Sequence, residues 1–305
     1  MVTMHKHATG TTSRGWIRYL PLASLGVIIL ILLTYLVDDD DHHRDPINRV
    51  SNKEPDRDDK LKNRLDTTLD QEKAAASHSS CPYRSMNDLT DEELHPVQGK
   101  RHMVTPPQGG SLHLVCCQTT KGPFNALVHE KWAPIGAKQF LDMVKSGYFS
   151  SIVPLMRCLE GFLCQFGLNG SPEVNKKWRQ SIPDDPNWLP EGPAHRKNED
   201  GVLRFAHGYL AYAGSGKNSR GNQFIVSLKD VEALAGGSPW EVPWGELVGK
   251  HSFETFSKVY TGYGEKGPSQ GKLSNQGWTE ALRKEFPLLD YITDCRVIDE
   301  QIEES

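Results

Sequence analysis

The most informative stretch of the chain is LHLVCCQTTKGPFNALV, residues 112–128. Strand-forming residues occupy 112–117 and 124–128, and a Lys-Gly-Pro turn separates the two runs. Two such runs around a glycine-containing turn are typical of an antiparallel hairpin. Because successive strand residues alternate sides, Cys116 and Cys117 are expected to point to opposite faces.

A helix is predicted directly after this hairpin. Pro134 suits a first helical turn, and Ile135, Phe140, Leu141 and Val144 then recur at helical spacing. The remaining elements are short. We expect strands at 152–156, 162–166, 203–205, 209–213, 223–227, 244–248 and 289–298, and helices at 251–260 and 278–286. Many short strands with few helices favour a closed barrel or a sandwich.

Composition limits the class of protein. The 305 residues carry 35 basic and 39 acidic side chains, a formal charge of −4. Nucleic-acid binding needs a basic excess, so no nucleic-acid partner is expected. No P-loop, zinc-protease or Cys-x-x-Cys motif occurs, so we expect neither a cofactor nor a metal site.

Residues 19–37, YLPLASLGVIILILLTYLV, form an uncharged apolar run of 19 residues. A membrane-spanning helix needs about 20 such residues. A cleaved signal peptide is the alternative, but the run exceeds the usual apolar length and lacks a small-x-small site. Residues 1–18 carry basic but no acidic side chains, and 38–45 hold five Asp. The positive-inside rule then predicts a type II signal-anchor with a cytosolic tail, residues 1–18, and a lumenal domain. The short span favours the endoplasmic reticulum or Golgi.

Residues 38–110 are predicted to be an acidic, largely disordered stalk, because they contain few aromatic and β-branched residues. The run DDDDHH at 38–43 contains metal-ligating residue types. Adjacent side chains do not converge on one ion without a fold to direct them, so a solvated acidic flank is the favoured interpretation.

Four blocks carry a resemblance to a known family. They are TTKGPFNAL (119–127) with APIGAKQF (133–140) and GYF (147–149); RCLEGFLCQFG (157–167); GYLAYA (208–213) with NSRGNQFIV (218–226); and WGELV (244–248) with ITDC (292–295). In this order they resemble a cyclophilin-type peptidyl-prolyl cis–trans isomerase domain over residues 112–299. The resemblance implies a mainly β fold, a closed eight-stranded antiparallel barrel capped by two helices, spanning residues 111–300.

The chemistry of such an isomerase requires no nucleophile. Rotation about an X–Pro bond meets a barrier of about 18–20 kcal/mol that amide resonance creates. A catalyst holds the proline ring, directs a donor at the imide nitrogen and stabilises the twisted amide. The resemblance implies catalytic roles for Arg157, Phe162 and Gln165. It implies substrate binding by Leu163, Ala213, Gly214, Gln223 and Ile225. These side chains are not all in phase on a strand, so a bend is expected at Glu160–Gly161.

Several positions depart from the family pattern. Met156 replaces a histidine, Phe166 a glycine, Gly214 an asparagine and Ile225 an aromatic residue, while Trp240 lies near the expected far wall. These changes make cyclosporin binding doubtful. The leading hypothesis is an isomerase that acts on X–Pro bonds of client proteins in the secretory lumen. The alternatives are a catalytically weak or inactive peptide-binding module, and a barrel appended to glycan-processing or trafficking machinery.

Two smaller features remain open at this level. If the first and last strands pair as in the family, Cys116 or Cys117 lies near Cys295, either as a disulfide or as two buried thiols. Asn169-Gly-Ser is a glycosylation sequon, although the following Pro172 argues against its use. The sequence does not decide whether the Pro- and Trp-rich insertion at 171–200 covers the site.

Overall fold

The computed structural model describes residues 81–94, 104–189, 205–231 and 239–303. All of them belong to one compact unit, residues 57–305. The predictions for the tail at 1–18, the anchor at 19–37 and most of the stalk fall outside the described residues.

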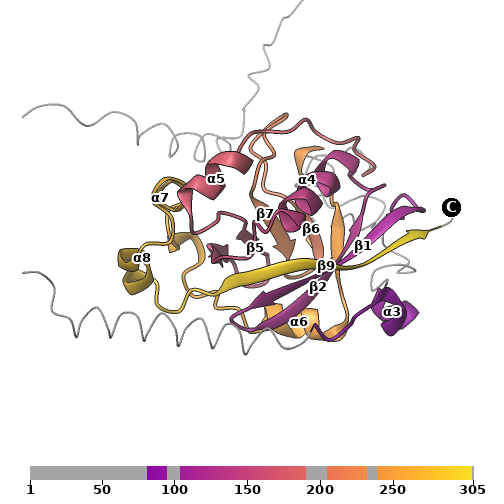
Figure 1. Cartoon of the computed structure of the whole chain (residues 1–305), viewed down its shortest axis with the longest axis horizontal. Coiled ribbons are helices and arrows are strands. Elements are labelled where there is room, and N and C mark those ends of the chain that lie inside the picture. Colours follow the sequence, from indigo (N-terminus) through magenta and orange to yellow (C-terminus); the bar gives the residue numbers. More distant parts are fainter. Residues whose placement is uncertain (1–80, 95–103, 190–204, 232–238, 304–305) are drawn as a thin grey trace, which may run out of the picture. The chain divides into compact units, whose positions relative to one another are not determined.

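A single curled antiparallel sheet organises this unit (Figure 1). Its order is β3-β9-β1-β2-β8-β6-β7-β5-β4. The strands are β1 (Gly110–Thr119), β2 (Gly122–His129), β3 (Val153–Pro154), β4 (Arg157–Cys158), β5 (Leu163–Phe166), β6 (Tyr209–Tyr212), β7 (Phe224–Ser227), β8 (Gly245–Val248) and β9 (Tyr291–Glu303).

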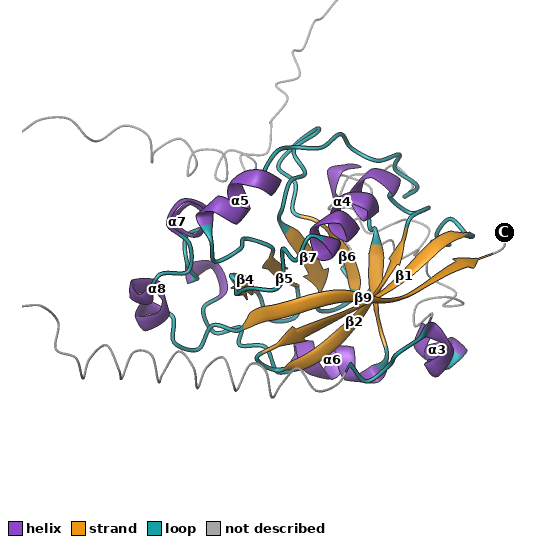
Figure 2. Cartoon of the chain, in the orientation of Figure 1, coloured by secondary structure: helices purple, strands orange, loops and turns teal. Residues whose placement is uncertain are grey.

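Short helices surround the sheet, and α4 and α6 lie above and below the strands in Figure 2. The helices are α3 (Asp91–Leu94), α4 (Pro134–Lys145), α5 (Pro172–Trp178), α6 (Lys250–Ser257), α7 (Gln270–Gln276) and α8 (Glu280–Glu285). Three 3-10 turns complete the set: η1 (Met86–Asp88), η2 (Pro239–Glu241) and η3 (Gly264–Lys266).

The closed eight-stranded barrel is not confirmed. Nine strands form the described sheet, and its two end strands, β3 and β4, are not paired with each other. Each of them has only two residues, and the chain between them spans just Leu155 and Met156. β3 bonds to β9 and β4 bonds to β5, so the ladder has two ends.

The predicted hairpin and first helix are present. The hairpin turns where Gly122 takes a φ of 119°, and the Thr119 hydroxyl donates to the Gly122 carbonyl at 2.7 Å. α4 begins at Pro134, as expected, but its N-cap residue Ala133 has no side chain that can cap. The missing cap comes from Asp185, which accepts hydrogen bonds from two amides of the first turn.

The main core lies on one face of the sheet and is rich in aromatic rings. Phe140 of α4 stacks on Trp244 at 4.3 Å between ring centroids and meets Phe224 edge-on at 5.3 Å. Phe256 of α6 packs on Phe124 of β2 at 5.1 Å. This burial fixes both helices to the strands, because buried apolar area is the main stabilising contribution to folding.

Residues 81–94, which the composition assigned to the stalk, pack on the sheet. Met86 and Leu89 join a buried cluster with Leu112 and Leu114 of β1. A disulfide joins Cys81 to Cys116 and fastens this segment to β1. The folded unit therefore begins upstream of residue 111.

Cys116 and Cys117 point to opposite faces, as predicted. Cys116 bonds to Cys81, and Cys117 bonds to Cys295, its register partner on β9. The sequence allowed either a disulfide to Cys295 or two buried thiols. The structure has the disulfide. Cys158 and Cys164 form a third disulfide, between β4 and β5.

The predicted localisation, a single-pass type II protein of the endoplasmic reticulum or Golgi, is contradicted. Within the described ranges, no helix combines the length and apolar character needed to cross a bilayer. The longest of these helices, α4, has 12 residues, against the roughly 20 that a span requires. Residues 19–37, on which the prediction rested, lie outside the described residues. The predicted lumenal placement of the domain depended on the same segment.

Candidate active site

One face of the sheet carries a row of side chains from four strands. Arg157 of β4 lies opposite Gln165 of β5, and Gln165 lies opposite Ile225 of β7. Ile225 in turn lies opposite Ala211 of β6. Directly opposed residues project from the same face of a sheet. This face is turned away from the main core, because Cys164, the neighbour of Gln165 on β5, points to the other face and belongs to that core.

The other predicted site residues join or flank this row. Leu163, Gln223 and Ala213 each lie two positions along the chain from a member of the row, so they share its face. Phe162 enters β5 from a turn in which Gly161 has a φ of 60°, which is the expected bend. The structure thus brings together six of the predicted site residues on one face. Phe162 and Gly214 lie at strand ends beside them.

A chain of polar contacts runs along the row. Arg157 donates from Nε and Nη2 to the two carboxylate oxygens of Glu265, at 2.7 and 2.6 Å. Its Nη1 points to Oε1 of Gln165 at 3.4 Å. The Gln165 amide donates to Oε1 of Gln223 at 2.9 Å. Gln165 of β5 and Gln223, the residue before β7, are therefore hydrogen-bonded to each other beside Arg157.

In the Arg157–Glu265 pair, the arginine is partly shielded from solvent and the carboxylate is largely exposed. The side chain of Arg157 is 28% exposed, whereas that of Glu265 is 65% exposed. Hydrogen bonding from Arg157 holds the pKa of the Glu265 carboxyl below its usual value. The Glu265 carboxyl is therefore charged near neutral pH, and its two hydrogen bonds with Arg157 define the direction of the guanidinium.

Next to these polar groups lies an apolar cluster. Leu163 and Ile225 are only 4% and 3% exposed and pack with Tyr209 and Trp132. Burial, together with the nearby Glu246 carboxylate, raises the pKa of Tyr209, so its phenol stays neutral. The apolar surface beside Arg157 and Gln165 is thus largely covered.

Trp240 explains the glycine at position 214. A Cβ on Gly214 would collide with the Trp240 ring. The indole of η2 therefore occupies the space that a side chain at 214 would need. An asparagine, the residue expected from the family pattern, would displace this ring.

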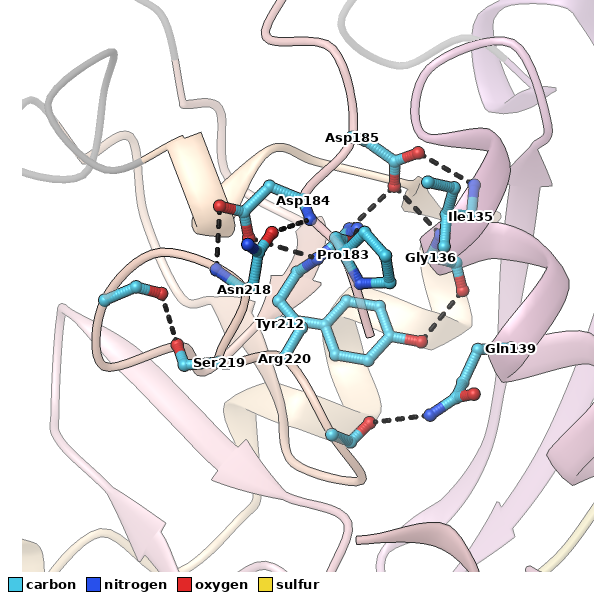
Figure 3. A network of polar contacts seen from close by, with 12 residues as sticks. Ile135, Gly136, Gln139, Pro183, Asp184, Asp185, Tyr212, Asn218, Ser219 and Arg220 are labelled. Atoms are coloured by element: carbon cyan, nitrogen blue, oxygen red, sulfur yellow. Dashed lines mark hydrogen bonds and ion pairs between the residues drawn. The ribbon is translucent and has the colours of Figure 1, made fainter. Parts of the chain in front are cut away.

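The described part of the insertion, up to Leu189, is fixed to the start of α4 and to Arg220 through Asp185 (Figure 3). Asp185 accepts from the backbone amides of Ile135 and Gly136 at 2.7 and 2.9 Å, and from Arg220 at 2.6 Å. Three residues further on, Trp188 packs against Trp132, with 5.6 Å between the ring centroids. The insertion therefore covers part of the apolar cluster.

Three residues of this region were not identified from the sequence. Glu265 lies 108 residues from Arg157, within a stretch that reads only as a turn-rich loop. Asp185 and Trp188 belong to the insertion, whose position no spacing pattern predicts. The one available signal was composition, because tryptophan side chains are highly buried on average.

The glycosylation sequon at Asn169 is buried in the fold. Asn169 is fully buried, and its amide donates to the Tyr148 carbonyl at 2.6 Å and to the Ser151 hydroxyl at 2.7 Å. The folded chain therefore cannot present this sequon to a glycosyltransferase. Among the residues that the structure describes, no group of three or more His, Cys, Asp or Glu side chains is placed to hold a metal.

Comparisons with known proteins give the family. The family model described as "Cyclophilin type peptidyl-prolyl cis-trans isomerase/CLD" matches residues 114–275. Peptidyl-prolyl isomerase CWC27 of Yarrowia lipolytica is 28% identical over 164 residues, covering 54% of this chain and 39% of that protein. Peptidyl-prolyl cis-trans isomerase-like 2 of Emericella nidulans is 26% identical, covering 53% of this chain and 25% of that protein. The match thus spans well under half of either relative.

Among solved structures, a cyclophilin-type isomerase of Cryptosporidium parvum, crystallised in the presence of the dipeptide Ala-Pro, is 18% identical. It covers 60% of this chain and 98% of its own, with a TM-score of 0.38. The family assignment rests on the family model, which matches more than half of the chain and contains both Arg157 and Gln165. This chain belongs to the cyclophilin-type peptidyl-prolyl cis-trans isomerase family.

Proposed function

We propose that this domain isomerises X–Pro bonds in exposed segments of client proteins, with Arg157 as the electrostatic catalyst. The observation that carries the proposal is the row of Arg157, Gln165 and Ile225 across three neighbouring strands. It places a permanently charged donor, an amide and an apolar surface on one face. These are the three groups that a twisted prolyl amide requires.

The roles follow from the chemistry of the bond. As the amide twists, the imide nitrogen loses conjugation and becomes a better hydrogen-bond acceptor, and a guanidinium N–H stabilises that state more than the planar one. Phe162, Leu163 and Ile225 hold the proline ring. Gln165 and Gln223 bind the peptide backbone.

The peptide chain then runs along the end of β6, past Ala213 and Gly214. Family members with an aromatic residue at position 225 offer a larger ring surface than Ile225 does. Leu163 and Ile225 are also nearly buried. We therefore expect cyclosporin-type ligands not to inhibit this domain.

The test is an isomerisation assay on the full chain with a panel of X–Pro peptides. Arg157→Ala should lower kcat by about 100-fold to 1000-fold, the usual effect of removing one transition-state donor. Arg283→Ala removes an exposed guanidinium from α8 and should leave the rate unchanged. Equal rates in the Arg157 variant and the parent would contradict the proposed site.

A second candidate function is a peptide-binding module without turnover. Two observations favour it: Glu265 already engages the guanidinium, and the apolar surface is mostly covered. A folded parent that binds proline peptides in titrations but does not accelerate their isomerisation would support this candidate over the first.

A further inference from the structure

Glu265 contacts Arg157 from the side away from the sheet row. Two nitrogens, Nε and Nη2, donate to its carboxylate, whereas Nη1 is directed to Gln165. The guanidinium is thus held between a carboxylate and an amide. Because a guanidinium is planar, fixing Nε and one terminal nitrogen also fixes the direction of the other.

The loop that carries Glu265 has anchors of its own. Its Tyr263 ring packs edge-on against Phe286, with 5.2 Å between the ring centroids, and its hydroxyl accepts from the amide of Leu288 at 3.1 Å. Gly267 passes so close to Met156 that a Cβ there would collide with the Met156 carbonyl oxygen. The carboxylate is therefore positioned by the loop, and not by Arg157 alone.

The contacts on the other side of Arg157 are weaker. The distance from Nη1 to Oε1 of Gln165 is 3.4 Å, which is long for a hydrogen bond. Without Glu265, the long arginine side chain would have one marginal hydrogen bond to define its direction. Its two short, charge-assisted bonds to Glu265 are the strong ones.

We propose that Glu265 is the positioning residue of Arg157, holding the guanidinium from behind so that Nη1 faces the bound prolyl bond. This inference rests on the proposed function. Glu265 touches neither the substrate nor the reacting atoms. It acts by orienting the donor before the peptide arrives, which raises kcat and leaves peptide affinity nearly unchanged.

The kinetic test compares Glu265→Gln with the parent, using the full chain. Glutamine has the same shape but no charge. We expect kcat to fall by about 10-fold to 100-fold, with KM within about twofold of the parent, since misplacing a catalytic group costs this much. Glu160→Gln, a matched loss of one exposed carboxylate beside the Gly161 turn, should leave both constants unchanged.

A double variant separates positioning from a general structural role. If Glu265 acts through Arg157, then Glu265→Gln should cause no further loss in an Arg157→Ala background. An equal loss in both backgrounds would overturn the proposal. So would a rise in kcat for Glu265→Gln alone, because it would make Glu265 a competitor for the donor.

A direct measurement covers the case in which the parent shows no turnover and the proposed function fails. The Nε–H resonance of Arg157, assigned by its disappearance in Arg157→Lys, should be sharp and protected from exchange in the parent. It should broaden or exchange rapidly in Glu265→Gln. An unchanged resonance would overturn the positioning role whatever the activity.

Discussion

Replacing Asp185 with asparagine tests how the insertion is held to the domain. Its carboxylate is fully buried and joins the first turn of α4 to Arg220, whose side chain is also fully buried (Figure 3). Asn keeps the shape and can still accept hydrogen bonds from Ile135 or Gly136. It removes the negative charge, so the Arg220 guanidinium is left buried without its closest counter-charge.

The expected cost follows from those contacts. Removing one partner of a buried ion pair costs about 3–5 kcal/mol. Asp184 remains 3.8 Å from the Arg220 Nε, and the Pro183 carbonyl still accepts from Nη2, so part of the charge stays compensated. We therefore expect the lower end, a loss of about 3 kcal/mol in the free energy of unfolding.

The assay is urea unfolding followed by tryptophan fluorescence, with Asp142→Asn as the control. Asp142 forms an exposed i,i+4 pair with Lys138 on the same helix, worth about 0.3–0.5 kcal/mol. Asp185→Asn should also alter the emission of Trp188, which follows Asp185 in the insertion. A loss in Asp185→Asn no larger than that of the control would refute the reasoning.

Two further predictions concern the sheet and the site. The Cys117–Cys295 disulfide closes a loop with a sequence separation of 178. On the chain-entropy relation, replacing both cysteines with serine should lower the free energy of unfolding by about 5 kcal/mol. Guanidinium unfolding under non-reducing conditions measures this loss. A loss below about 1 kcal/mol would show that this pair does not constrain the unfolded chain. Gly214→Ala should displace Trp240, cost about 1–3 kcal/mol and change the KM for proline peptides, because the added methyl group overlaps the indole. Gly271→Ala, at an open position in α7, is its control, and equal effects of the two substitutions would contradict the overlap.

Much of the fold was predictable because its signals are local. The hairpin at β1 and β2, the start of α4 at Pro134 and the division of Cys116 and Cys117 between two faces follow from alternation, turn chemistry and helical spacing. The shared face of Arg157 and Gln165 was also within reach, since both lie within one short hairpin and a bend at Gly161 brings them into register.

Other features depended on contacts that no local pattern encodes. Composition placed residues 81–94 in a stalk, but Met86 gains burial and Cys81 gains a bond only once β1 is formed. Pro172 argued against use of the sequon at Asn169, but the burial of its amide by Tyr148 and Ser151 appears only in the folded chain. The two-residue end strands β3 and β4, at which the described sheet stops, are likewise not visible in periodicity.

The sequence by itself determined the family, most of the strand positions and the residues proposed for the candidate site. Only the tertiary structure decided what surrounds them: Glu265 behind Arg157, Trp240 over Gly214, and an insertion fixed by Asp185. The physical reason is the distance along the chain over which each interaction acts. Backbone periodicity and turn preference act over a few residues, whereas an ion pair between residues 108 apart exists only after the chain has folded both into place.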